Sequence, residues 1–217
     1  MLEKLLSTGI RNQRLATAFL IATHLAGAIG LIYEPTRALF QNLTPLNLLV
    51  TAGIIFHFEK GKSAHYFIFI ITTFLIGYFV EVLGVKTGLI FGEYVYGNTL
   101  GFKVFDVPLS IGLNWAILIY VSGITSNRLT KNFWLRIVLG ALIMLLLDFL
   151  IEPAAIAFDF WTWFTIEVPM QNYIGWFLLS FLLHAFFQKL RFEKINPLAV
   201  ILLIIQFFFF ALLNIFY

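Results

Sequence analysis

Long apolar segments recur along this chain, and they limit its possible folds more than any other feature. A helix that crosses a membrane needs about 20 mainly apolar residues, with a range of about 17–25. Hydrophobic residues make up 61% of the chain and charged residues only 12%, against about 25% charged in an ordinary soluble domain. We therefore expect an all-α integral membrane protein with about seven transmembrane helices. The segments are roughly Leu15–Tyr33, Pro45–Phe58, His65–Leu83, Pro108–Ile124, Phe133–Ile151, Pro169–Gln188 and Pro197–Phe216.

The segment Pro45–Phe58 is shorter than a membrane-spanning helix needs. Two alternatives therefore remain open, which are seven helices or six helices with this piece re-entrant. The distribution of basic residues favours seven, because a six-helix count reverses the later loops and removes the asymmetry between the two sides.

Basic residues are concentrated on one side of the seven-helix topology. If the N-terminus is cytoplasmic, eleven of the 14 Lys and Arg residues fall on the cytoplasmic side, which is the positive-inside pattern. We expect a multi-pass protein of the cell membrane with its N-terminus in the cytoplasm and its C-terminus outside. The eleven are Lys4, Arg11, Arg14, Lys60, Lys62, Arg128, Lys131, Arg136, Lys189, Arg191 and Lys194, and the outer three are Arg37, Lys86 and Lys103.

Acidic residues show the opposite bias, since eight of the 11 lie at or near the outer side. Acids contribute little to membrane orientation, so the bias has another cause. It indicates either a solvated acidic face or chemistry in the outer half of the membrane. The eight are Glu34, Glu81, Glu93, Asp106, Asp148, Glu152, Asp159 and Glu167.

The composition also excludes several kinds of chemistry. The absence of cysteine excludes disulfides, iron–sulfur clusters and thiol catalysis. The glycine-rich stretch from Gly88 to Gly101 is not a phosphate loop, because no Gly-Lys-Ser/Thr follows it. The four histidines show no spacing typical of metal ligands, so we predict no metal site. The net charge of +3 gives no indication of a nucleic acid partner.

Two stretches of the chain repeat the same spacing. Glu81 precedes the Tyr94–Tyr96 stretch by thirteen residues, and Asp148 precedes the Trp161–Trp163 stretch by the same number. A Val-Pro pair also stands before a tryptophan twice, with the proline seven residues ahead each time. These matches predict two helix–loop–helix units in parallel orientation, related by duplication, and duplicated membrane halves often hold a binding site at their interface.

The repeat sets our expected organisation, which is a single transmembrane domain over residues 1–217. The Val-Pro pairs are Val107-Pro108 before Trp115 and Val168-Pro169 before Trp176. The expected parts are a degenerate first helix pair at 15–58, repeat units at roughly 65–125 and 133–188, and an extra C-terminal helix at 197–216.

Glu81, Asp148 and Glu152 are the candidate catalytic residues. A charged group within a membrane helix costs about 2.5–3.5 kcal/mol on insertion scales, and by default it indicates a function. Glu152 lies four residues after Asp148, on the same face of the helix, and is either a further acid or a residue at the water boundary. Alternatively, the acids cap helix ends or pair with basic neighbours. Two carboxyl groups held close together share a proton, which one of them then donates.

Aromatic and amide residues near the outer side are the candidate substrate-binding residues. The alternative for the aromatic residues is an ordinary belt at the membrane interface, but the inner side has far fewer of them. The asparagines orient a water molecule or hydrogen-bond between helices. The candidates are Tyr94, Tyr96, Asn114, Trp115, Trp161, Trp163, Asn172, Tyr173 and Trp176.

These motifs resemble the membrane-bound carotenoid-biosynthesis proteins, a family that includes γ-carotene 1′,2′-hydratase and bisanhydrobacterioruberin hydratase. The resemblance covers about residues 75–185 and lies in Gly88–Tyr96, Val107–Ile111 with Trp115, Asp148–Pro153, Trp161–Trp163 and Val168–Trp176. It implies addition of water to the terminal C1′=C2′ double bond of an acyclic carotenoid end. It also implies a carotenoid substrate taken from membrane lipid, and other enzymes of carotenoid synthesis as possible partners.

The chemistry of this reaction fits the candidate residues and needs no cofactor. A protonated carboxyl group gives its proton to the alkene, aromatic faces stabilise the resulting tertiary cation, and water captures it. Asp148 is the favoured acid, with Glu81 as its partner and Glu152 next. We expect Glu81 and Asp148 to lie near each other, within reach of Tyr94 and Trp161.

Two other functions remain open. The layout is similar to that of small membrane lycopene cyclases, but those have Pro-x-Glu-Glu where this chain has Pro169-Met-Gln-Asn172. Both reactions begin by protonating an end-group alkene, so a shared fold does not separate them. The other alternative is a non-enzymatic substrate-binding subunit of a transporter.

The charge asymmetry leads to a test of the topology. A reporter fused after Tyr217 should behave as an exported domain, because seven crossings from a cytoplasmic N-terminus end outside. Activity of a reporter that works only in the cytoplasm would contradict the seven-span topology.

Overall fold

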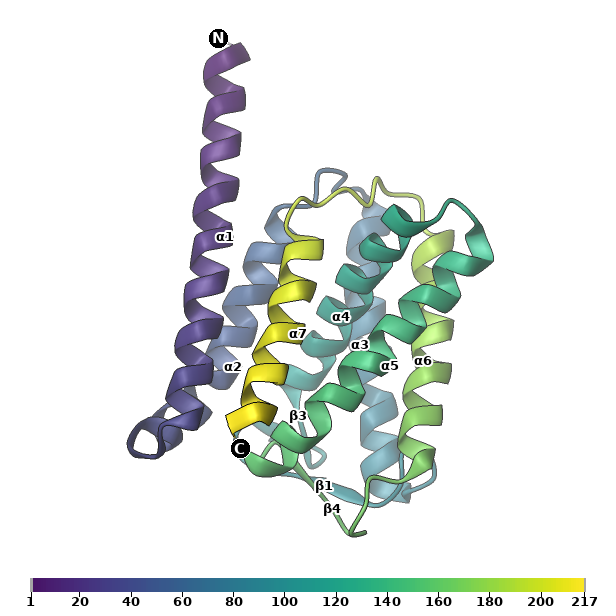
Figure 1. Cartoon of the computed structure of the whole chain (residues 1–217). Coiled ribbons are helices and arrows are strands. Elements are labelled where there is room, and N and C mark those ends of the chain that lie inside the picture. The colour runs from purple at the N-terminus through teal and green to yellow at the C-terminus, as the bar shows by residue number, and fades with distance from the viewer. Residues whose placement is uncertain (1, 217) are drawn as a thin grey trace.

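The computed structural model describes residues 2–216, with side chains from Arg11 onward, so the side chain of Lys4 and all of Tyr217 lie outside the described part. Within this range, the chain forms one bundle of seven helices that run up and down beside one another (Figure 1). The expected all-α membrane fold is confirmed. The helices are α1 Leu2–Ile32, α2 Glu34–His57, α3 Ala64–Thr87, α4 Leu109–Leu129, α5 Phe133–Ala157, α6 Met170–Lys189 and α7 Ala199–Phe216.

Six of the described helices are long and apolar enough to cross a membrane, and α6 is not among these six. Its 20 residues include the buried polar side chains of Asn172, Ser180 and His184. Ser122 of α4 lies 2.8 Å from the His184 ring, measured from Oγ to Nε2. The polar groups of α6 therefore face the bundle, and the chain is a multi-pass membrane protein.

Helix α2 is longer than the sequence suggested. It begins at Glu34, runs through Pro45 and ends at His57, so it is long and apolar enough for a full span. Proline lacks a backbone N–H and usually breaks a helix. Here the ring of Pro45 packs instead against the loop residue Gly101, whose φ of +87° and lack of a Cβ permit the contact.

Helix α5 also passes through a proline. It continues beyond the expected end at Ile151, through Pro153, to Ala157. The ring of Pro153 is exposed on the outside of the bundle. Because α5 continues past this proline, Glu152 lies inside a helix and not at its end.

Four short strands lie in the two long loops at one end of the bundle, which we call the capped end (Figure 1). The strand β1 pairs antiparallel with β4 and so joins the α3–α4 loop to the α5–α6 loop. The second pair, β2 with β3, lies within the α3–α4 loop. The strands are β1 Tyr94–Tyr96, β2 Lys103–Val104, β3 Val107–Pro108 and β4 Trp161–Trp163.

The two loops lead into their next helices in the same way. Pro108 precedes α4 with φ −64° and ψ 135°, and Pro169 precedes α6 with φ −62° and ψ 138°. The tryptophans seven residues later, Trp115 and Trp176, stack with ring centroids 4.4 Å apart. These matched features support the duplication of two units, which remains a proposal.

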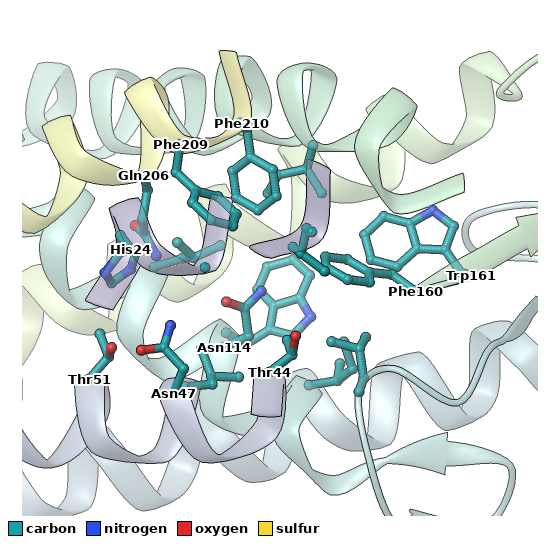
Figure 2. Close-up of a pocket in the computed structure, with 18 of the residues that line it drawn as sticks. His24, Thr44, Asn47, Thr51, Asn114, Phe160, Trp161, Gln206, Phe209 and Phe210 are labelled. Carbon is teal, nitrogen blue, oxygen red and sulfur yellow. The ribbon is translucent and has the colours of Figure 1, made fainter. Parts of the chain in front are cut away.

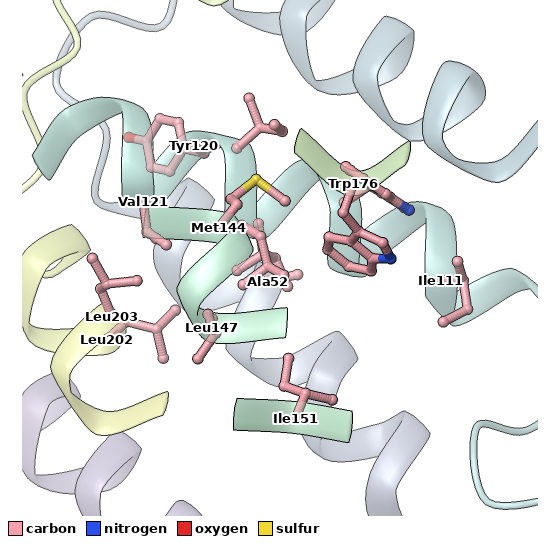
Figure 3. Close-up of a cluster of buried hydrophobic side chains, with 14 of the residues drawn as sticks. Ala52, Ile111, Tyr120, Val121, Met144, Leu147, Ile151, Trp176, Leu202 and Leu203 are labelled. Carbon is pink, nitrogen blue, oxygen red and sulfur yellow. The ribbon is translucent and has the colours of Figure 1, made fainter. Parts of the chain in front are cut away.

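Helix α4 is the centre of the bundle. Of the most apolar 18-residue stretch of α4, 72% is buried inside the protein, against 17% to 39% for the same kind of stretch in the other five candidate spans. Figure 3 shows side chains of α2, α5, α6 and α7 gathered with those of α4 in one buried cluster. Helices α2, α3, α5, α6 and α7 therefore pack around α4, with α1 against α2 and α7, and their outer faces are exposed, as expected in lipid.

The end opposite the strands is held together by Glu59, which follows α2. Its carboxylate accepts hydrogen bonds from the hydroxyl of Tyr120 at 2.5 Å, the backbone N–H of Gly61 at 2.9 Å and that of Ile195 at 3.2 Å. Asn196 donates to the Tyr120 hydroxyl at 3.1 Å. One buried carboxylate thus links α4 to the α2–α3 and α6–α7 loops.

Removing the Tyr120 hydroxyl tests this link. Tyr120→Phe should lower the free energy of unfolding by about 1–3 kcal/mol, because Glu59 loses a donor and the Asn196 amide loses an acceptor. Thermal unfolding in detergent measures the loss. Tyr33→Phe is the control, since its side chain is 59% exposed, and equal stability of the two variants would contradict the role of Glu59.

Candidate active site

A cavity of about 380 Å³ lies inside the bundle next to the capped end (Figure 2). Side chains from α1, α2, α4 and α7 form most of its wall, and β1 and β4 close one end. Two acidic residues, Glu81 and Glu152, are part of the lining. The cavity therefore combines an apolar wall with carboxyl groups, as an enzyme site for a hydrophobic molecule requires.

Glu81 of α3 is held by three aromatic donors. Its Oε2 accepts from the hydroxyls of Tyr94 at 2.6 Å and Tyr96 at 2.7 Å, and its Oε1 accepts from Nε1 of Trp115 at 3.0 Å. Alternate residues of a strand point to the same face, so β1 directs both tyrosines at one carboxyl group. Gly84, one turn along α3, allows this approach, because a Cβ there would lie 3.1 Å from the Tyr94 hydroxyl.

Glu152 of α5 is held in a matching way by β4. Its Oε2 accepts from Nε1 of Trp161 at 3.0 Å and of Trp163 at 2.9 Å. Its Oε1 accepts from the side-chain amide of Asn172 at 3.0 Å. The residue is only 2% exposed, so it does not lie at the water boundary, which was one of the two expectations.

Asp148 lies one helical turn before Glu152 and is completely buried. Asn172 donates to its Oδ2 at 3.1 Å, and its Oδ1 has no hydrogen-bond partner among the described residues. The amide of Asn172 therefore bridges two carboxyl groups. Asp148 itself is not part of the cavity lining.

The strand pair β1–β4 brings the two sets of donors together. Tyr94 lies opposite Trp163 and Tyr96 opposite Trp161, with ring centroids 5.0 Å and 6.2 Å apart. We expected Glu81 and Asp148 to lie near each other, within reach of Tyr94 and Trp161. Tyr94 donates to Glu81, whereas Trp161 donates to Glu152, which stands nine residues before it, and not to Asp148. The proximity of Glu81 to Asp148 stays a prediction.

The three outer basic residues have other partners. Lys86 forms an ion pair with Asp106, Nζ of Lys103 donates to the carbonyl of Tyr96 at 2.6 Å, and Arg37 donates to the carbonyls of α1. The hydrogen bonds to the three acids of the site all come from neutral side chains. The alternative that these acids are simply paired with basic neighbours therefore finds no support.

The tyrosine hydroxyls remain hydrogen-bond donors over a wide range of pH. Burial, together with the nearby Glu81 carboxyl group, raises the pKa of Tyr94 and of Tyr96 well above the usual value. These side chains therefore stay neutral at ordinary pH and hold the carboxyl group without transferring a proton to it.

The other predicted substrate-binding residues divide between the cavity and its surroundings. Asn114, Trp115, Asn172 and Trp176 line the cavity. Tyr173 is not part of the lining and packs against Phe149, with ring centroids 5.8 Å apart. Among the described side chains, no group of three or more His, Asp or Glu residues is arranged to hold a metal ion.

Sequence reasoning missed the part of the cavity that α1, α2 and α7 supply. Their polar lining residues include His24, Asn47, Thr51 and Gln206, and Figure 2 labels all four. Gln206 interrupts the apolar run of α7, and that interruption is a signal that could have identified it. The others lack a spacing that predicts a shared site.

The fold and the site define a helical multi-pass membrane protein with a buried cluster of acids under an aromatic cap. The chain belongs to the carotenoid biosynthesis protein family, whose model matches residues 44–217. It is also similar to bisanhydrobacterioruberin hydratase from Haloarcula japonica, with 29% identity over 172 residues that cover 72% of this chain and 56% of that protein. The chain thus spans little more than half the length of this relative. No solved structure matches.

The pairing of β1 with β4 is open to a direct test, because the chain contains no cysteine. Val95 and Thr162 are directly opposite each other, so their Cα atoms lie within the range that a disulfide bridges. The Val95→Cys, Thr162→Cys double variant should oxidise readily and become protected from a thiol-reactive maleimide until it is reduced. Val95→Cys with Ile166→Cys is the control and should stay labelled, and similar protection of the two variants would contradict the strand register.

Proposed function

We propose that this protein is a hydratase that adds water to the terminal C1′=C2′ double bond of an acyclic carotenoid end and needs no cofactor. The observation that carries the proposal is the position of Glu81 and Glu152, which belong to different helices and line one aromatic cavity. The family and the name of the Haloarcula relative support it. An apolar polyene reaches such a cavity from the membrane, and acids in the wall supply the chemistry that an alkene requires.

The pair of Asp148 and Glu152 supplies the proton. The two carboxyl groups share the Asn172 amide, and close buried acids typically hold one proton between them. The unpartnered Oδ1 of Asp148 is a place for that proton to rest. Glu152 delivers it to carbon C2′, because Glu152 lines the cavity and Asp148 does not. This assigns Asp148, the acid that the sequence favoured, to the supply of the proton.

Protonation leaves a tertiary cation at C1′, and the cap stabilises it. The faces of aromatic rings attract cations, and Tyr94, Trp161 and Trp163 are all part of the lining. Water then forms a bond to C1′ and loses one proton to Glu81, with Asn114 orienting the water. One water molecule is added in total, and the acid pair regains its proton from Glu81 before the next turnover.

We also infer that the capped end faces the outside of the cell. The loops at the opposite end carry Lys60, Lys62, Lys131, Arg191 and Lys194, and basic loops remain in the cytoplasm. The acid site then lies in the outer half of the membrane, and the N-terminus is cytoplasmic.

Expression in a host that makes an acyclic carotenoid tests the proposed reaction. The product should contain one added water, with no ring formed and the length of the polyene unchanged. Glu152→Gln and Glu81→Gln should each lower turnover by about 10²–10⁴-fold, which is the usual contribution of general acid–base catalysis. Pigment mass analysis measures both results.

Glu167→Gln is the matched control, because Glu167 is an exposed acid in the loop that follows β4. It should leave turnover unchanged. An isomeric, cyclised product of unchanged mass would contradict hydration and favour a cyclase. Unaltered pigment with inserted, folded protein and several acyclic substrates would favour the transport subunit.

A further inference from the structure

The cavity has a second polar region, formed by helices that the acid site does not use. His24 of α1, Thr51 of α2 and Gln206 of α7 all contribute to its lining. In Figure 2 they lie at the opposite end of the pocket from Trp161. The edge contact between the His24 ring and Phe209, with centroids 5.8 Å apart, places α1 against α7 at this level.

The polar groups of this region lack partners. Oγ1 of Thr51 and Oε1 of Gln206 have no hydrogen-bond partner among the described residues, although the two side chains are only 2% and 7% exposed. Nδ1 of His24 lies 2.8 Å from the carbonyl of Leu20, so it donates there, and Nε2 is left as an acceptor. Three polar side chains from three helices therefore line one space without forming hydrogen bonds to one another.

Leaving such groups unpaired is unfavourable, and native structures rarely do so. Gln206 Oε1 and His24 Nε2 accept, the Thr51 hydroxyl both donates and accepts, and the Gln206 amide N–H groups donate. Their common complement is an O–H group. A buried water typically makes about three hydrogen bonds, which these three side chains can supply.

We propose that His24, Thr51 and Gln206 form a binding site for one O–H group at the end of the cavity away from the acids. Such an O–H group belongs either to a water molecule held for the reaction or to the hydroxyl of an isoprenoid alcohol. The binding site stands on its own contacts, and only the role of a stored water rests on the proposed hydration.

The test uses Thr51→Val and Gln206→Met, which keep side-chain size and remove the unpaired oxygen. Lycopene and its tertiary monoalcohol are the probes. Binding is followed by quenching of tryptophan fluorescence, because Trp115, Trp161 and Trp163 line the cavity. Turnover of lycopene is measured separately.

Thr73→Val is the matched control. Thr73 is also completely buried, and its Oγ1 also has no partner among the described residues, but it does not line the cavity. It should change neither binding nor turnover, beyond any general effect on stability that thermal unfolding reports.

The two sources give different results. If the site holds an alcohol, each variant should weaken binding of the monoalcohol by about three- to tenfold and leave lycopene unaffected. If it holds water, both affinities should stay unchanged while lycopene turnover falls by a similar factor. Variants that match Thr73→Val in binding and turnover would overturn the proposal. If the unmodified protein turns over no lycopene, the hydratase proposal fails. In that case, variants that bind the monoalcohol as tightly as the unmodified protein does would overturn this site as well.

Discussion

The structure depends on how it satisfies carboxyl groups buried in a membrane protein. A carboxyl group in an apolar interior is costly unless hydrogen bonds compensate for the lost water. This chain supplies those bonds from outside the helices, through tyrosines of β1 and tryptophans of β4. The two strands pair with each other, so satisfying one acid also positions the donors of the other. The cap and the acid site consequently form one structural unit.

This dependence explains why short strands occur in a helical membrane protein. An irregular loop packed against the buried acids would leave its own buried backbone groups without partners, whereas the β1–β4 pair satisfies them and aims alternate side chains at the bundle. The aromatic rings have two uses as a result. Their N–H and O–H groups hold Glu81 and Glu152, and their faces line the space in which a hydrophobic molecule would lie.

The two ends of the bundle use buried acids differently. At the end opposite the cap, Glu59 ties together two loops and α4, and it does not line the cavity. At the capped end, Glu81 and Glu152 have similar numbers of donors and also border the cavity. Access to the cavity, rather than burial, therefore separates Glu59 from Glu81 and Glu152.

Sequence alone predicts the membrane class, most helix positions, the three acids and the aromatic residues that hold them, because apolar length and charge are local properties. It misplaced the start of α2 and the end of α5, since proline usually breaks a helix. In the folded chain the Pro45 ring packs against Gly101, and the Pro153 ring is exposed on the outside of the bundle. Pairing Trp161 with Glu152, placing Asp148 behind the cavity wall, and bringing His24, Thr51 and Gln206 together were decided by tertiary structure. Those contacts depend on strand register and helix rotation, which bring together residues far apart in the chain and leave no fixed spacing in it.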